Sequence, residues 1–334
     1  RGEGEARPEV TSGGVPGCSV VSLMKGSKRT PHPEMAIWLL VFIWGSNFSV
    51  LKYAFEQIEP LALNGIRFVL ASILLALFLR MSGERISIRR ADWGRVVGLG
   101  ILGNTIYQVL FIVGLSLTLA GNSSLMLATV PVFVALFSVA RSHERIRLLG
   151  WMGILVSVAG IAFVVVGGNR TVGFGATTLR GDMLSLVAAL VWSIYTVGTR
   201  PLVREYGTLP VTAVTMWIGA AALLAVAAPS IMRQPWAEVT VLAWAALAYS
   251  GVFGIAIAYV LWNYGIKHLG SSRTALYSNT IPIVAILFAW GTIGEVPTSL
   301  QVVGTVLVLG GIILARASRE DADDLLSARP GTKG

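Results

Sequence analysis

Residues 100–161 read GILGNTIYQVLFIVGLSLTLAGNSSLMLATVPVFVALFSVARSHERIRLLGWMGILVSVAGI, and this stretch recurs at residues 251–312. At an offset of 151 residues, without a gap, 16 of the 62 positions are identical. Matching Leu or Val would mean little in so apolar a chain, but Gly, Pro and Glu also match. These are Gly100, Gly103, Gly114, Pro131, Glu144, Gly153 and Gly160 in the first copy and Gly251, Gly254, Gly265, Pro282, Glu295, Gly304 and Gly311 in the second. The sequence is therefore an internal duplication.

Composition places the chain among membrane proteins. Hydrophobic residues make up 54% and charged residues 13%, with a mean hydropathy of +0.73, whereas about a quarter of residues are charged in soluble domains. The net charge of +9 does not indicate nucleic-acid binding, because the basic residues lie in short gaps between apolar runs. Cys18 is the only cysteine, so neither a disulfide within the chain nor a thiol site is expected.

Charged residues divide the apolar sequence into segments that can each cross about 30 Å of hydrocarbon, which takes roughly 20 helical residues. We expect an all-α integral membrane protein with ten transmembrane helices, arranged as two inverted five-helix repeats. The predicted spans are residues 36–54, 62–80, 96–119, 121–140, 149–167, 182–200, 209–229, 240–266, 272–291 and 299–316. Residues 96–140 carry no charge, so they must form two spans with a tight turn near Gly121.

The domain organisation follows from these spans. Residues 1–35 are expected to be a disordered tail, or sequence upstream of the natural start, because Met35 opens the first apolar run. A secretory signal is disfavoured, since Trp44, Asn47 and Lys52 do not suit its apolar region. Residues 36–168 and 180–316 are the two repeats, and residues 317–334 form a polar C-terminal tail.

The distribution of Lys and Arg predicts the orientation, because basic loops stay on the cytoplasmic side. With both termini in the cytoplasm, the cytoplasmic loops carry Arg80, Arg85, Arg89, Arg90, Arg95, Arg141, Arg145, Arg147, Arg200, Arg204, Lys267 and Arg273. The opposite loops carry only Arg170, Arg180 and Arg233, besides Lys52 at a span end. Each repeat has five spans, an odd number, so the second enters the membrane the opposite way up.

Several short motifs resemble the EamA family of the drug/metabolite transporter superfamily. They are Trp44-Gly45-Ser46-Asn47-Phe48, Arg67-Phe68, and a Pro131 span leading to Glu144-Arg145, with Pro282 and Glu295 kept in the second copy. The resemblance covers residues 36–316. It implies a ten-helix inverted repeat that moves small metabolites, often exporting amino acids or their derivatives, through a cavity between the halves. His143 departs from the family pattern, which has a glycine before the Glu, as Gly294 does before Glu295.

Polar and aromatic residues inside the spans are the candidate substrate-binding residues, since such groups are costly in lipid. Asn104 and Gln108 share a helical face with Phe111, and their repeat partners include Tyr259 and Trp262, with Asn263 adjacent. Amides in one half and aromatic rings in the other suit a polar metabolite with an apolar part. The complete predicted set is Trp44, Asn47, Asn104, Gln108, Trp192, Tyr195, Tyr259, Trp262, Asn263, Tyr277 and Asn279. Hydrogen bonding between helices and interfacial placement are the structural alternatives.

Prolines and basic residues add further candidates. Pro131 and Pro282 lie mid-span, where each would bend its helix, either as a hinged gate or as a static kink. Arg67 could attract an anionic group, or could reach the headgroups or backbone carbonyls. Lys52 is expected to reach the headgroups. Gly150, Gly153, Gly160, Gly304, Gly310 and Gly311 predict close packing of the fifth and tenth spans, within the chain or in a homodimer.

The sequence contains no sign of a cofactor, a metal site or an ATP-binding loop. No Asp or Glu is expected deep within a span, because Asp182 and the other acids fall at span edges or in loops, so proton coupling through a buried carboxylate is not supported. The favoured function is a secondary transporter of a small polar metabolite, with efflux of an amino acid or derivative across a bacterial inner membrane by alternating access. A membrane structural or assembly protein and, less favoured, an integral membrane enzyme are the alternatives.

Overall fold

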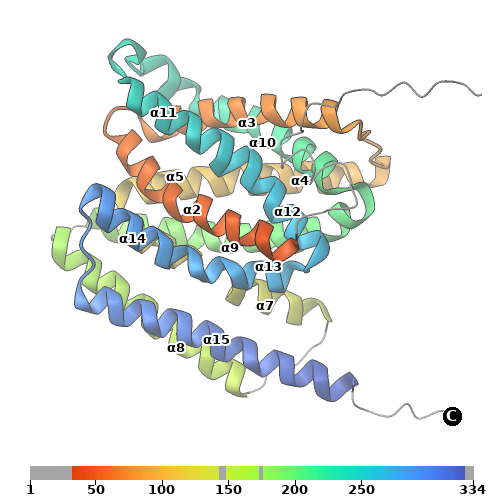
Figure 1. Cartoon of the computed structure of the whole chain (residues 1–334), viewed down its shortest axis with the longest axis vertical. Helices are drawn as coiled ribbons and strands as arrows, with labels where there is room; N and C mark the ends of the chain where they lie inside the picture. Colours follow the sequence, from red (N-terminus) through yellow and green to blue (C-terminus); the bar gives the residue numbers. More distant parts are fainter. Residues whose placement is uncertain (1–31, 143–147, 173–175, 328–334) are drawn as a thin grey trace, which may run out of the picture.

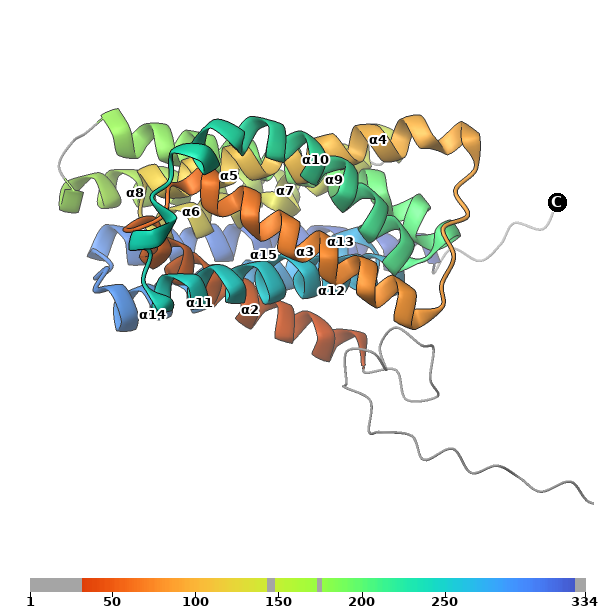
Figure 2. The same ribbon diagram turned by 90° about the horizontal axis from the view of Figure 1, so that it is seen from above.

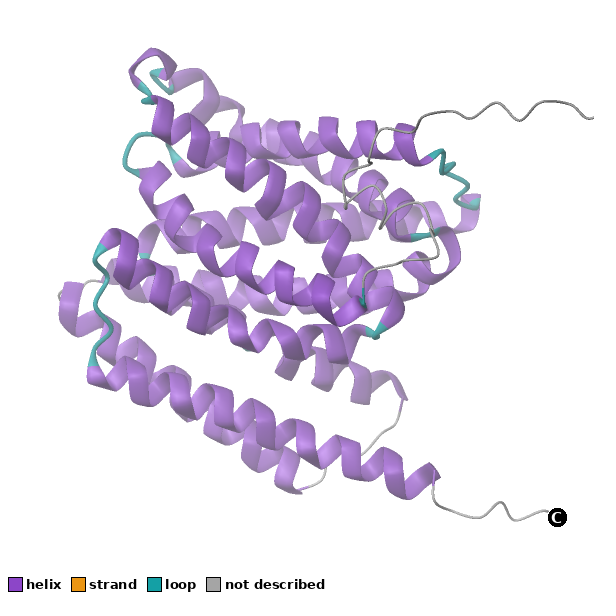
Figure 3. Cartoon of the chain, viewed as in Figure 1, coloured by secondary structure: helices purple, strands orange, loops and turns teal. Residues whose placement is uncertain are grey.

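The computed structural model describes residues 32–142, 148–172 and 176–327. Within these residues the regular structure is entirely helical, as Figure 3 shows. Helices are expected here, since a chain crossing lipid must satisfy its backbone hydrogen bonds internally. Residues 1–31, residues 328–334 and the loop with Glu144 and Arg145 lie outside the described residues, and what the sequence predicts for them stays a prediction.

The helices follow the expected spans along the chain. Those of the first half are α2 (Pro33–Phe55), α3 (Pro60–Ser82), α4 (Trp93–Ile101), α5 (Tyr107–Leu117), α6 (Ala120–Leu127), α7 (Val130–Ser142) and α8 (Leu148–Val172). Those of the second half are α9 (Ala176–Tyr206), α10 (Thr208–Arg233), α11 (Val241–Tyr249), α12 (Ala258–His268), α13 (Ser271–Tyr277), α14 (Ile281–Ile293) and α15 (Ser299–Ser327). Helix α15 continues eleven residues past the predicted end at 316.

Six of the described helical segments are long and apolar enough to cross a membrane. They are Pro33–Phe55, Pro60–Ser82, Arg90–Leu117, Thr177–Tyr206, Thr208–Arg233 and Val241–His268. Four shorter apolar segments coincide with the remaining predicted spans, namely Ala120–Val134, Leu148–Val164, Ser278–Ile293 and Ser299–Gly311. Large apolar side chains such as Trp38, Ile73 and Leu155 are exposed on these helices. A surface of this kind suits lipid, and the chain is an integral membrane protein.

The helices run approximately along one common direction, in both Figure 1 and Figure 2. Helices α8 and α15 lie side by side at one margin of the molecule, below the main group in Figure 1. Glycines make this pairing close, because a Cβ on Gly304 would lie 2.7 Å from the Gly160 carbonyl oxygen. The predicted packing of the fifth and tenth spans is thus found within the chain. Gly310, in contrast, has no neighbour within 4 Å of such a Cβ.

Two of the predicted spans are broken at their prolines. Helix α6 ends at Leu127 and α7 begins at Val130, while the 3-10 turn η5 (Ser278–Thr280) separates α13 from α14. Pro131 and Pro282 are each the second residue of the following helix, where a missing N–H costs nothing. The sequence suggested that each proline bends a continuous helix. In the structure each proline instead lies at the start of a new helix.

Two further spans contain matched π-helical segments. Segment η2 (Leu102–Ile106) joins α4 to α5, and η4 (Ser250–Ile257) joins α11 to α12. The 3-10 turns η1 (Arg90–Asp92) and η3 (Trp236–Glu238) precede these two spans. A π segment inserts extra backbone into a helix and rotates all later side chains relative to earlier ones. This rotation determines which residues of the two spans face the centre.

Candidate functional site

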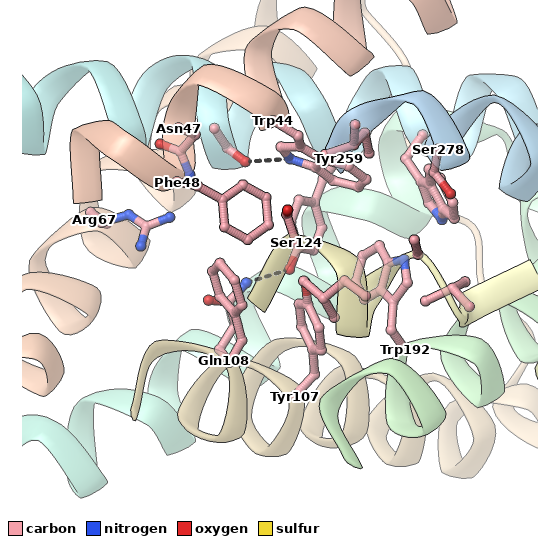
Figure 4. A pocket seen from close by; sticks show the side chains of 17 residues that line it. Trp44, Asn47, Phe48, Arg67, Tyr107, Gln108, Ser124, Trp192, Tyr259 and Ser278 are labelled. Atoms are coloured by element: carbon pink, nitrogen blue, oxygen red, sulfur yellow. Dashed lines mark hydrogen bonds between the residues drawn. The ribbon is translucent and has the colours of Figure 1, made fainter. Parts of the chain in front are cut away.

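A cavity of about 50 Å³ lies at the centre of the helix bundle, lined by residues of both halves of the chain (Figure 4). Its walls come from α2, α3, α5, α6, α7, α9, η4, α12, η5 and α14, with the break between α6 and α7. The lining residues are Trp44, Asn47, Phe48, Arg67, Tyr107, Gln108, Phe111, Ser124, Leu127, Ala128, Val130, Trp192, Gly254, Tyr259, Trp262, Ser278 and Ile281. Such a volume holds only a few water molecules.

Aromatic rings form most of the cavity wall. The Trp44 and Trp262 ring centroids are 5.3 Å apart, and Trp192 lies 5.9 Å from the first and 5.7 Å from the second. Tyr107 packs on Trp192 at 4.6 Å, and Tyr259 meets it edge-on at 5.1 Å. Such rings offer apolar surface together with electron-rich faces that attract cations. The wall can therefore accept both an apolar body and an ammonium group.

Two hydrogen bonds join the halves across the cavity, and both are drawn in Figure 4. The Gln108 Nε2 donates to the Tyr259 hydroxyl at 2.7 Å. The indole Nε1 of Trp44 donates to the Gly254 carbonyl at 2.9 Å. Gly254 lies within the π segment η4, and a Cβ there would come 2.8 Å from the Asn47 Oδ1. The π segment and its glycine thus let α2 approach closely enough for Trp44 to reach the backbone.

Arg67 places a positive charge in the cavity wall. Its side chain is 1% exposed, so it does not reach the headgroups, one of the alternatives that the sequence left open. Its guanidinium donates to the Asn64 Oδ1 at 3.3 Å, while its Nε has no hydrogen-bond partner among the described residues. Within the described part of the chain, no Asp or Glu lines the cavity. A buried cation without an acidic partner is costly, and a bound anion would relieve that cost.

Other polar atoms of the lining also lack hydrogen-bond partners in the described structure. Asn47 and Gln108 have unpaired acceptor oxygens, and Trp262 has an unpaired indole N–H. Each unpaired buried donor or acceptor costs about 1–3 kcal/mol, so native proteins satisfy nearly all of them. Among the lining residues, donors are thus unpaired at Arg67 and Trp262, and acceptors are unpaired at Asn47 and Gln108.

The structure brings seven of the predicted residues together around this cavity: Trp44, Asn47, Arg67, Gln108, Trp192, Tyr259 and Trp262. Asn104 does not line it, because its amide donates to the Thr215 carbonyl on α10 at 3.1 Å. Asn104 sits within η2, so the α-helical periodicity that paired it with Gln108 fails there.

The remaining predicted residues lie around the lining rather than in it. Tyr195 stacks on Trp192 at 4.9 Å, and Asn263 donates to the Thr212 hydroxyl at 2.8 Å. Tyr277 packs edge-on against Trp38 at 5.6 Å. Asn279 is buried in η5 beside Ser278, which does line the cavity. These four residues support the lining or its surroundings.

Sequence reasoning missed several residues of functional interest. Tyr107 lines the cavity, and the only available signal was its position next to Gln108. Asp182, interpreted from the sequence as a residue at a span edge, lies near the start of α9 and is fully buried there. Lys52, expected at the headgroups, instead donates to the Thr118 carbonyl at 2.8 Å. Both side chains point into a polar network that the spacing of charges could not reveal.

Among the residues that the structure describes, no three His, Cys, Asp or Glu side chains gather as a metal site would require. The sequence pattern that defines the EamA-like transporter family matches residues 33–166 and again residues 179–317. The chain belongs to the EamA-like transporter family. The family consists of transporters, and the relatives are named as transporters, so the chain is a transporter protein rather than an enzyme.

Curated relatives of this EamA protein are similar over nearly their whole length. An uncharacterized transporter of Archaeoglobus fulgidus is 28% identical over 86% of this chain and 98% of its own. The uncharacterized transporter YyaM of Bacillus subtilis is 28% identical over 85% and 94%. A probable terminal-alkyne amino-acid exporter of Streptantibioticus cattleyicolor is 31% identical over 84% and 92%. A crystal structure with 22% identity and a TM-score of 0.65 covers 86% of this chain and shares its fold.

Proposed function

We propose that this EamA protein is a secondary transporter that carries an amino acid, or a derivative with a free carboxylate, by alternating access through the central cavity. The observation that carries this proposal is Arg67, a buried cation in the cavity wall with no acidic partner there. A carboxylate entering the cavity would pair with the guanidinium in a site shielded from water, where charged hydrogen bonds are strong.

The other unpaired atoms of the lining support a zwitterionic ligand. The indole N–H of Trp262 supplements Arg67 as a donor to the carboxylate. The unpaired oxygens of Asn47 and Gln108 would accept N–H bonds from an ammonium group. The tryptophan rings would hold the side chain and contribute cation–π attraction to the same ammonium. We therefore assign Trp44, Asn47, Gln108, Trp192, Tyr259 and Trp262 to substrate binding, with Tyr195, Asn263, Tyr277, Asn279 and Asn104 as supporting residues.

We further propose that all ten apolar segments cross the membrane as two inverted five-helix units, residues 36–168 and 180–316. Contacts that recur between repeat partners support this arrangement. A Cβ on Gly160 would meet the Gly304 carbonyl at 2.7 Å, and one on Gly311 would meet the Gly153 carbonyl at 2.5 Å. Gly311 and Gly153 are the repeat partners of Gly160 and Gly304, so exchanging the halves turns one contact into the other.

Two more features agree with a two-fold exchange. Gln108 bonds directly to its own repeat partner, Tyr259, as expected for residues near the exchange axis. The family pattern also matches the chain twice, once in each proposed unit. Because each unit has an odd number of spans, the axis lies in the membrane plane and the units run in opposite directions.

The small size of the cavity indicates that the protein must rearrange to bind a substrate. At about 50 Å³ it has no room for an amino acid, so the helices around it must move when substrate binds. The breaks before Pro131 and Pro282 lie beside the lining residues Val130 and Ile281. We propose that these breaks are the hinges of the movement.

Efflux is the proposed direction, and a bacterial inner membrane with both termini in the cytoplasm is the proposed location. The probable amino-acid exporter among the relatives supports the direction. The excess of Arg and Lys in alternate loops supports the orientation. A structural or assembly protein would have no use for unpaired donors and acceptors in an internal cavity, since each of them lowers its stability.

The test is exchange of L-phenylalanine across proteoliposomes, compared with L-phenylalaninamide, which lacks the carboxylate. Arg67→Met should slow phenylalanine exchange by about 10-fold or more and affect the amide much less. Arg180→Met, which removes an exposed cation from α9, is the control and should change neither rate. Equal loss for both probes would contradict carboxylate recognition, and failure of amino acids, nucleosides and drugs alike to exchange would contradict transport.

A further inference from the structure

A polar network lies at one end of the bundle, outside the central cavity, where the turn between α5 and α6 meets α9 and the start of α15. Its central group is Asp182, whose side chain is fully buried in α9. The Thr118 hydroxyl donates to the Asp182 Oδ1 at 2.6 Å. The Asn122 amide donates to the two carboxylate oxygens at 3.3 and 3.4 Å. The carboxylate thus joins the two halves of the chain.

The hydrogen bonds of the network all run toward Asp182. The Thr298 backbone N–H donates to the Gln301 Oε1 at 2.9 Å, which leaves the Gln301 amide nitrogen as the free donor. That nitrogen donates to the Asn122 Oδ1 at 2.7 Å, so the Asn122 nitrogen must face the carboxylate. Aligned donors polarise one another and strengthen the last bond. The chain from α15 through α6 to α9 is therefore built to end on a charged acceptor.

Other charged groups near this carboxylate are already engaged elsewhere. On α2, the Lys52 ammonium donates to the Thr118 carbonyl at 2.8 Å. After α14, the Glu295 carboxylate accepts the Ala120 backbone N–H at 2.9 Å. On α9 itself, Arg180 is exposed. Among the described residues, no basic side chain lies within 4.0 Å of the Asp182 carboxylate, the distance limit for an ion pair. A proton is thus the simplest way to neutralise this buried carboxylate.

Helix α6 connects the network to the substrate cavity. Asn122 stands at the start of this eight-residue helix, while Ser124 and Leu127, further along it, line the cavity. Helix α9 makes a second connection, because it carries Asp182 near one end and the cavity residue Trp192 further along. A change in the charge of Asp182 therefore acts on two helices that line the cavity.

We propose that Asp182 is the proton-binding site that couples transport to a proton gradient, an inference that rests on the proposed transport function. In the arrangement seen here the carboxylate accepts three hydrogen bonds, which hold the start of α6 against α9. A proton transferred from water to Asp182 neutralises the carboxylate and turns one acceptor oxygen into a donor, which the Thr118 hydroxyl can accept by rotating but the Asn122 N–H cannot. The aligned chain then ends on the wrong group, so α6 separates from α9 and this end opens. Release of the proton restores the bonds.

The inference corrects the sequence-based view that proton coupling through a buried carboxylate is unsupported. That view depended on the position of Asp182 at the beginning of an apolar segment. Because α9 begins at Ala176 and packs against α5 and α6, the residue lies more than one turn inside a covered helix. Its burial comes from neighbouring helices, and the local sequence does not show it.

The experiment compares two modes of transport with L-phenylalanine as the probe. Wild-type protein in proteoliposomes should accumulate phenylalanine when a pH gradient is imposed, and should exchange it without a gradient. Asp182→Asn resembles the protonated carboxyl, with one acceptor oxygen and one donor group, but cannot take up or release a proton. It should retain exchange within about twofold and lose gradient-driven accumulation at least about tenfold. Glu56→Gln, which changes an exposed acid at the same end, should leave both unchanged.

Accumulation by Asp182→Asn at the wild-type level would overturn the inference while leaving the proposed transport function intact. Accumulation by the wild type that is driven by a sodium gradient alone would have the same meaning. Infrared difference spectra of the purified protein, between about pH 5 and about pH 8, provide a second readout that needs no substrate. Other carboxyls contribute to these spectra, but one protonated-carboxyl band of the wild type should be missing from the Asp182→Asn spectrum. If Asp182→Asn does not fold, Thr118→Val should shift the same band. A band unaffected by either variant would refute the proposal even if no probe is transported.

Discussion

The two ends of the bundle are joined in different ways. At one end, Asp182, Asn122 and Gln301 form a buried network between the halves. At the other, Arg89 in the loop before α4 meets Glu205 at the end of α9, at 2.6 Å, with 67% and 44% of the two side chains exposed. Separating buried hydrogen-bonded groups costs a large free energy, whereas separating exposed ion pairs costs little. The network end should therefore control when the transporter opens.

The equivalent turns of the two repeats show the same contrast. The turn between α5 and α6 receives the side chains of Lys52 and Glu295 on its backbone. The turn between α12 and α13, 151 residues later, uses Gly270 with φ of 86°. There the Ser271 hydroxyl donates to the Thr196 carbonyl at 3.3 Å. A glycine turn holds itself by backbone geometry, while the α5–α6 turn depends on side chains from distant helices.

The largest effect is expected from Asn122→Ala. This change removes the amide that bridges Gln301 and Asp182, and leaves a buried acceptor and a buried donor without partners. We expect a loss of about 2–3 kcal/mol in unfolding free energy, together with a larger population open at the network end. Unfolding in mixed micelles measures the first, and labelling of a cysteine at Ser123 by a water-soluble reagent measures the second.

Gln301→Ala is the matched variant, since it removes one bond of the same network while leaving Asn122 on Asp182. Its effect should be smaller than that of Asn122→Ala and have the same sign. An Asn122→Ala protein as stable as the wild type, with unchanged labelling, would show that the two ends are equally easy to open.

A second, smaller effect is expected at the break between α6 and α7, beside the cavity. Pro131→Ala restores a backbone N–H, so α6 and α7 can join into one helix, and α6 loses its freedom to move alone. Exchange of phenylalanine should slow by about 3–10-fold with little change in apparent affinity. Rates from stopped-flow exchange decide this. Unchanged turnover would mean that the break is static.

The sequence predicts part of this fold and part of its site. The offset of 151 residues and the charge-free stretch 96–140 located the helices, because lipid restricts the backbone to helices. The same reasoning could not place the π segments, whose extra residue removed Asn104 from the lining. Nor could it show that Asp182 is buried, since neighbours from other helices determine that. Local pattern predicts the elements, and contacts between elements determine the site.

A third effect concerns pH. Burial raises the pKa of Glu295 above its ordinary 4.5, and Lys52 and the backbone N–H groups of Ala120 and Gly121 offset part of this. The folded state thus binds the proton more tightly than the unfolded state, and this contribution to stability is lost as pH rises through the raised value. Glu295→Gln has no proton to lose. Its stability relative to wild type should increase from about pH 4.5 upward, in melting curves recorded across pH.

Glu84 provides the comparison at the other end. Burial also raises its pKa, with Lys267 offsetting part of the rise, so Glu84→Gln should show a pH dependence of the same sign. If Glu295→Gln is instead less stable than wild type at every pH, attraction by Lys52 outweighs burial. The carboxylate would then be a structural part of the network end.

The smallest effect is expected from Arg89→Ala at the exposed end. Arg89 donates to the Tyr206 hydroxyl at 3.0 Å and pairs with Asp92 and Glu205, but water and salt compete for all of these contacts. Tyr206 also donates to Asp92, so that link survives. The melting temperature should fall by no more than about 2 °C, and added salt should abolish the difference. A larger, salt-independent loss would mean that this end is locked as firmly as the buried one, and control of opening would then belong to both.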